Sequence, residues 1–184
     1  MLKQKLGFPI KFKMKGSKKN FLPLASFDIH LENYQSLVNE FRRNNDISHI
    51  KSILNDTWTT ELTKKVFQED YDAMVLTDTN QKILWVSAGF RDMTGYSKKY
   101  ALGKRPSFLQ GEETSKSVKN QIRKELFYNH TFSGSLMNYR KNGETYLCQI
   151  SIYPIYDSND RLDNFLAFEK EIPVHKPRID TYLS

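Results

Sequence analysis

Side chains that could carry out catalysis or bind a metal are few and scattered. Cys148 is the only cysteine, which excludes an intramolecular disulfide and a multi-cysteine metal site. The four histidines lack a ligand spacing such as H-x-x-x-H, and no G-x-S-x-G, phosphate-loop or HExxH pattern occurs. The acidic pairs Asp70/Asp72 and Glu112/Glu113 are typical of surface or capping positions. The sequence therefore predicts a protein that is not an enzyme.

Polar residues that could hold a ligand occur around the stretch 103–111, which reads G-K-R-P-S-F-L-Q-G. A helix-like run carrying Arg123 follows it, and a hairpin signal centred on Asn142-Gly143 comes after that. Glu169 follows in an apolar strand pattern. A bare charge is costly there, so we expect its carboxyl, if buried, to be protonated or paired.

The elements that must position these side chains follow from the apolar and turn patterns. Two strands are expected near 74–77 and 83–86, then a short helix over 88–94 and a helix capped by Thr114. Three further strands are expected over 132–141, 144–155 and 164–170. This order predicts an α+β fold with a five-stranded antiparallel sheet and small helices on one face, preceded by N-terminal amphipathic helices.

The register of the 132–155 hairpin has two alternatives. A two-residue turn at Asn142-Gly143 places Tyr139 opposite Tyr146, whereas one more loop residue places Asn138 opposite Cys148. A shift of one residue exchanges the faces of every side chain. The residues alone do not decide between the two registers.

Ala88-Gly89-Phe90, the segment 93–96 (M-T-G-Y) and the stretch 103–111 resemble the PAS fold, and within it the flavin-binding LOV branch. The resemblance favours the register that pairs Asn138 with Cys148. It implies a cofactor pocket between the sheet and the segment 98–123, with FMN as a possible ligand, although the ligand itself stays unknown. The site residues that it implies are Thr77, Arg105, Gln110, Arg123, Asn138, Cys148 and Glu169. The wider lining expected adds Val75, Phe108, Leu109, Ile122, Ile150, Phe165 and Ala167.

The chain departs from the LOV pattern at several of these places. Arg105, Pro106 and Ser107 stand where LOV domains carry an asparagine, the photoactive cysteine and an arginine. Glu169 stands where a glutamine is usual, and Cys148 where a second asparagine is usual. Because proline has no nucleophile, the resemblance implies a protein without the cysteinyl photochemistry of LOV relatives. Electron transfer to a bound ring would then come from a nearby Tyr or Trp, such as Tyr139 or Trp85.

The N-terminal part differs in composition from the rest of the chain. Seven of the 28 basic residues, all lysine, fall within the first 20 positions, so the rest is balanced at 21 basic and 21 acidic residues. We expect a basic, disordered leader over 1–22, a helical extension over 23–70, the PAS-like domain over 71–172 and a tail over 173–184. The extension is expected to contain three helices, with the first ending near Asn44-Asn45. Its first apolar stripe is Phe27, Leu31, Tyr34, Leu37, Val38 and Phe41, and we expect it to pair two copies of the chain.

Three functions remain open from the sequence. The first is a sensor that binds a small ligand and passes a change to an unidentified protein partner. The second is a ligand-free PAS module that acts as a dimerisation adaptor. The third is contact with nucleic acid or an anionic membrane through the lysines, with nucleic acid disfavoured because that segment has no arginine and only two aromatic residues. A cytoplasmic location is expected because no apolar run approaches the ~20 residues of a membrane span.

Overall fold

A computed structural model describes residues 25–173, and the exposure of side chains from residue 34 onward. The chain divides into two units, residues 1–39 and residues 40–184. The predicted leader, most of the predicted tail, and the side chains of Phe27 and Leu31 lie outside the described residues. No helix among the described residues is long and apolar enough to cross a membrane.

The sheet of the second unit is antiparallel and has the strand order β2-β1-β5-β4-β3. Its strands are β1 (Ala73–Asp78), β2 (Ile83–Val86), β3 (Phe132–Tyr139), β4 (Thr145–Tyr156) and β5 (Leu162–Ile172). The central strands β1 and β5 are buried along most of their length, as a strand covered on both faces must be. The α+β fold with five antiparallel strands is confirmed.

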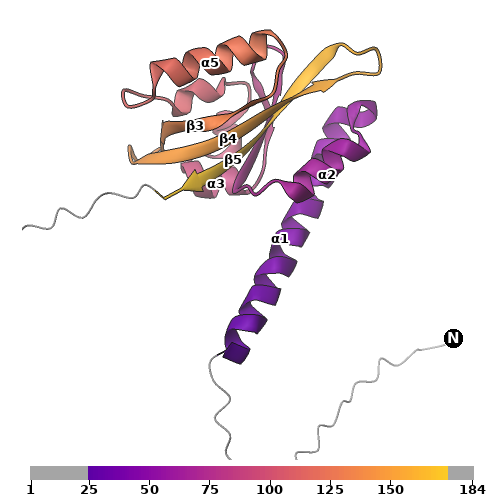
Figure 1. The fold of residues 1–184 in the computed structure, drawn as a ribbon, viewed down its shortest axis with the longest axis vertical. Helices are drawn as coiled ribbons and strands as arrows, with labels where there is room; N and C mark the ends of the chain where they lie inside the picture. The colour runs from indigo at the N-terminus through magenta and orange to yellow at the C-terminus, as the bar shows by residue number, and fades with distance from the viewer. Residues whose placement is uncertain (1–24, 174–184) are drawn as a thin grey trace, which may run out of the picture. The chain divides into compact units, whose positions relative to one another are not determined.

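One face of the sheet is covered by the short helices between β2 and β3. These are α3 (Gly89–Thr94), α4 (Lys98–Ala101), the 3₁₀ segment η2 (Pro106–Leu109) and α5 (Lys116–Phe127). Figure 1 shows α5 running alongside β3. Phe90 and Leu109 pack with Val75, Leu136 and Phe165 in the core on this face. Pro106 is tolerated because it occupies the first turn of η2, where a missing N–H costs little.

The start of α5 differs from the prediction by one residue. Ser115, not Thr114, is the cap, and its side chain accepts from the Val118 N–H. The Thr114 hydroxyl instead accepts from Gly111 N at 2.9 Å and donates to the Met137 carbonyl at 2.6 Å. Thr114 therefore ties the η2–α5 connection to strand β3.

The other face of the sheet carries a second core, formed with the end of α1 (Ala25–Leu54) and with α2 (Thr60–Gln68). Ile47, Ile50 and Val66 pack there against the sheet residues Met74 and Phe168. Polar contacts hold the same junction: Tyr153 Oη donates to Glu69 Oε1 at 2.5 Å. Within the second unit, the extension is therefore part of the folded body.

The expectation of separate first and second helices in the extension was wrong. Helix α1 runs without a break through Asn44 and Asn45 to Leu54. Asparagine costs a helix interior only a few tenths of a kcal/mol, and no glycine or proline interrupts this segment. The break comes at Asn55, whose positive φ of 46° ends the helix before the 3₁₀ turn η1 (Asn55–Thr57).

Neither register considered for the β3–β4 hairpin is observed. Tyr139 pairs with Thr145 and Asn138 with Tyr146, so the loop is the three residues 141–143 closed by Arg140 and Glu144. Gly143, at φ 89°, takes the left-handed conformation that ends such a loop. Cys148 therefore faces Leu136 rather than Asn138. Both Asn138 and Cys148 still point to the helical face, because their parity matches that of the expected register.

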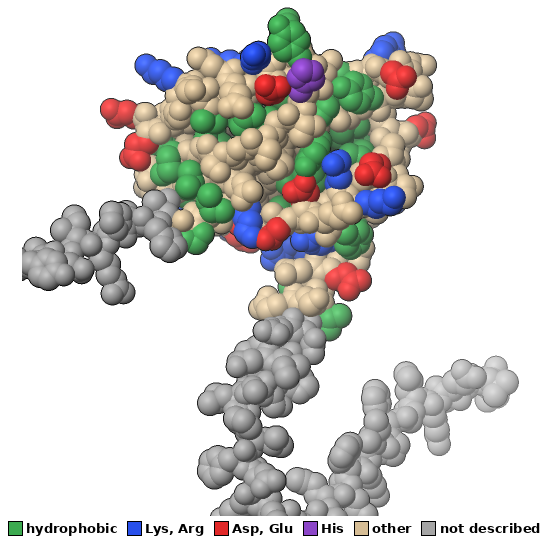
Figure 2. All heavy atoms as spheres, in the orientation of Figure 1, with side chains coloured by type: hydrophobic (Ala, Val, Ile, Leu, Met, Phe, Trp, Pro, Cys, Tyr) green, Lys and Arg blue, Asp and Glu red, His purple; other side chains and the backbone are tan. Residues whose placement is uncertain are grey.

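Charged side chains are spread over the surface of the folded body. Figure 2 shows acidic and basic groups interspersed on the face in view, without a patch of one sign. The lysine-rich segment of the third functional hypothesis lies outside the described residues.

Candidate functional site

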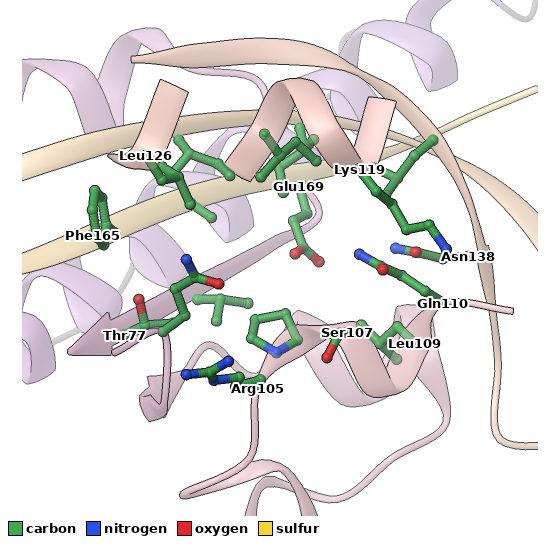
Figure 3. Close-up of a pocket in the computed structure, with 18 of the residues that line it drawn as sticks. Thr77, Arg105, Ser107, Leu109, Gln110, Lys119, Leu126, Asn138, Phe165 and Glu169 are labelled. Atoms are coloured by element: carbon green, nitrogen blue, oxygen red, sulfur yellow. The ribbon is translucent and has the colours of Figure 1, made fainter. Parts of the chain in front are cut away.

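A cavity of about 120 Å³ lies between the helical face of the sheet and the segment from η2 to α5. Apolar side chains from both layers form its walls: Val75, Leu109, Ile122, Leu126, Leu136, Ile150, Ile152, Phe165 and Ala167. Figure 3 shows Glu169, on β5, pointing into the space between these layers, with Thr77, Arg105, Ser107 and Gln110 around it. Apolar walls with a few convergent polar groups are typical of a small-molecule site.

Two buried side chains in this cavity each have one oxygen without a hydrogen-bond partner. They are Asn138 Oδ1 and Glu169 Oε2, and both residues are buried. Nearly all buried polar atoms in proteins are paired, because leaving one unpaired costs about 1–3 kcal/mol. These two oxygens are therefore free to accept or share a hydrogen bond inside the cavity.

Burial raises the pKa of Glu169 from its ordinary 4.5 to about 7. Desolvation is the cause, and among the described residues no cation forms an ion pair with Glu169 that would stabilise its charged form. Behind it, Tyr146 and Cys148 also have raised pKa values, first through burial and then through the nearby Glu169 charge. The inner end of the cavity is consequently acidic but uncharged at mildly acidic pH.

Positive side chains line the same cavity nearer to solvent. Arg105 and Arg123 are exposed, and Lys119 is half-buried. The Arg123 guanidinium donates to Asn120 Oδ1 at 3.2 Å, on its own helix, and forms no ion pair among the described residues. The cavity therefore has an apolar, neutral interior and a cationic rim.

Six of the seven predicted site residues meet in this cavity: Thr77, Arg105, Gln110, Arg123, Asn138 and Glu169. The seventh, Cys148, does not line it. The hairpin register places its buried side chain opposite Leu136, and Leu136 and Ile150 form the wall. Phe108 also lies outside the lining and packs against Tyr96 and Tyr100 instead.

Several lining residues were missed by the sequence prediction: Gln81, Lys119, Leu126, Leu136 and Ile152. Leu126 and Ile152 follow the helical and strand periods of predicted members, so periodicity could have found them. Gln81 had no such signal, because its position depends on a φ of 63° in the β1–β2 turn. Trp85, expected near a bound ring, lies in the core on the opposite face, where His49 stacks on it.

The described residues contain no group of three or more metal-ligating side chains.

Comparison with protein families gives a match to the PAS domain over residues 72–172, more than half of the chain. The chain belongs to the PAS domain family. As a PAS domain, the matched region is a sensory module, not a catalytic one.

The proteins to which the chain is similar include blue-light photoreceptors, and solved LOV structures are among its structural matches. A "Blue-light photoreceptor" of Listeria innocua is 39% identical over 102 residues, which is 54% of this chain but only 40% of that protein. The chain therefore covers less than half of this relative. The solved dark structure of the photoreceptor Aureochrome1 LOV matches with a TM-score of 0.58 at 28% identity, covering 63% of this chain and 86% of that one. The light-state dimer of the fungal photoreceptor Vivid matches with a TM-score of 0.51 at 26% identity, covering 53% and 75%.

Proposed function

We propose that this protein is a sensor that binds a flavin such as FMN in the cavity and relays a change through protein–protein contact. The observation that carries the proposal is the pair of unpartnered atoms, Asn138 Oδ1 and Glu169 Oε2, inside apolar walls with a cationic rim. A flavin has a planar apolar ring system, a polar edge with donors and acceptors, and a tail that is anionic in FMN. When bound, it would supply absorption of blue light.

The residues present fit such a ligand in chemistry. Asn138 Oδ1 can accept from a ring N–H, Glu169 and Gln110 can bond other ring atoms, and the rim cations suit a phosphate. The cavity, at about 120 Å³, is smaller than the ~300–1,000 Å³ of typical small-molecule sites. Entry of the ring system therefore requires outward movement of rim side chains, and Arg105 and Arg123 are exposed enough to move.

The test is titration of the protein into FMN, followed by flavin fluorescence and anisotropy. We expect saturable binding at one flavin per chain, and at least about tenfold weaker binding by Asn138→Ala, because a buried hydrogen bond and its packing are lost. Ser135→Ala, on the same strand but outside the cavity, is the matched control and should bind as the wild type does. Absence of saturable binding would contradict the proposal.

The cationic rim predicts a difference between FMN and riboflavin, which lacks the phosphate. Arg123→Ala should weaken binding of FMN several-fold and leave riboflavin nearly unchanged, because an exposed charge–phosphate contact contributes about 1 kcal/mol or less. Equal losses for both flavins would place Arg123 away from the phosphate. Lys124→Ala, at the neighbouring exposed position outside the cavity, is the control.

We also propose that two copies of the chain associate through helix α1. The association is either the change that the sensor relays or a permanent dimer. Tyr34, Leu37 and Phe41 are exposed along this helix at spacings of three and four residues. Exposed apolar residues repeated in this way are typical of helix pairing. The structural similarity to the Vivid light-state dimer supports association of two like chains.

A further inference from the structure

Glu169 is a carboxylic acid buried in the wall of the cavity, and it forms no ion pair with a described residue. The residue is 2% exposed, and its enclosed oxygen Oε2 has no partner. Its backbone carbonyl accepts from Asp72 N at 2.9 Å. Strand neighbours on either side are Ala73 on β1 and Ile150 on β4.

Among the described residues, no charged group around this carboxyl forms an ion pair with it. The charged and titratable groups in its surroundings are Arg105 before η2, Lys119 and Arg123 on α5, Tyr146 and Cys148 on β4, and Asp72 and Glu171 along the adjoining backbone. None of the three cations forms an ion pair with it. Tyr146 and Cys148 stay protonated, since burial raises the pKa of each. Asp72 Oδ2 is already bonded to Glu171 N at 2.9 Å.

We propose that Glu169 works as a neutral carboxylic acid that donates its proton in a hydrogen bond to an acceptor atom of the ligand. This inference rests on the proposed ligand site and goes beyond it. The site thereby selects ligands that present an acceptor to Glu169 and an N–H or O–H donor to Asn138 Oδ1, as a lactam or imide edge does. Ligand and proton are bound together, which an amide at this position does not permit.

The proton makes ligand affinity depend on pH. The pKa of Glu169 is raised to about 7, so its acid form predominates below that pH and is lost above it. A ligand that requires the acid form therefore binds with constant affinity under acidic conditions. Well above pH 7, affinity falls by about tenfold for each pH unit, because one proton must be taken up per ligand.

Riboflavin is the suitable probe, since it has no phosphate that titrates in the same range. We expect its affinity for the wild-type protein to fall as pH rises from about 6 to about 8.5, and its affinity for Glu169→Gln to stay constant. The glutamine variant keeps the size and a donor but cannot ionise. Parallel pH profiles for the two proteins would overturn the proposal.

A second measurement needs no ligand. The infrared difference between wild type and Glu169→Gln should contain the C=O stretch of a protonated carboxylic acid at about pH 6, disappearing as pH rises through about 7. Absence of this band at acidic pH overturns the proposal even when riboflavin binds. If the band titrates but no flavin binds, the flavin assignment fails while the neutral Glu169 is supported. The two failures are thus distinguishable.

Discussion

At the scale of single residues, burial of the Glu169 carboxyl in the cavity makes the folded state less stable at neutral pH than at acidic pH. Its folded pKa of about 7 exceeds the unfolded value of about 4.5. The folded state therefore binds the proton more tightly, and this contribution to stability is fully present below about pH 4.5. It is lost progressively as pH rises through about 7.

The stability of Glu169→Gln should consequently vary less with pH than that of the wild type. Relative to wild type, the glutamine variant should gain up to about 3 kcal/mol in free energy of unfolding between about pH 4.5 and pH 8, from a shift of two to three pKa units. Urea denaturation at both pH values measures it. Glu144→Gln, an exposed carboxyl, is the comparison and should show no comparable gain. A wild-type profile parallel to that of the variant would refute the raised pKa.

Sequence reasoning about single residues succeeded where the polar character of a residue and the sheet face of its strand position both pointed to the cavity. Glu169 and Asn138 were assigned to the pocket by the resemblance to LOV domains, and both line the cavity. Cys148 was misplaced because the loop of residues 141–143 sets the pairing of β3 with β4, and an Asn-Gly dipeptide permits several loop lengths. Trp85 was misplaced because no strand pattern was used to assign its face; it pairs with Leu76 on β1 and lies with it in the second core.

At the scale of elements, the end of α1 and all of α2 act as the cover of the second sheet face. Ile50 is 0% exposed there, whereas Ile53, one turn on, is 38% exposed. We expect Ile50→Ala to lower the free energy of unfolding by about 2–5 kcal/mol, through lost burial and a cavity. Ile53→Ala should cost less than about 1 kcal/mol. Chemical denaturation of both variants measures the contrast, and equal costs would mean that this helix does not depend on the sheet.

The order and type of most elements could be predicted because the turn residues and periods agree locally. The continuity of α1 could not, because asparagines at 44 and 45 only weakly oppose a helix, and packing of Ile47 and Ile50 on the sheet decides the outcome. The cap of α5 also depended on a long-range contact, the bond from Thr114 to β3, which the sequence does not display.

At the scale of the whole molecule, the exposed apolar residues of α1 predict the oligomeric state. The triple variant Tyr34→Gln, Leu37→Gln and Phe41→Gln should shift the mass in solution from dimer to monomer, since glutamine keeps helix propensity but removes apolar surface. Light scattering at micromolar concentration provides the measurement. Phe41 is 78% exposed and Phe127, on α5, is 79% exposed, so Phe127→Gln is a matched control that should remain dimeric. A wild-type monomer would contradict the proposal.

The strand order has a consequence for how such a unit is carried in longer polypeptides. The first residue of β1, Ala73, pairs with Glu169 near the end of β5, so the backbone enters and leaves the sheet through neighbouring central strands at the same end. A host chain can therefore accept the unit between two of its own segments without separating them, as tolerated domain insertions require. Because β1 and β5 are hydrogen-bonded to each other, a change in the twist of β1 also displaces β5. A segment attached after Ile172 would thus be displaced together with the helices that precede Ala73.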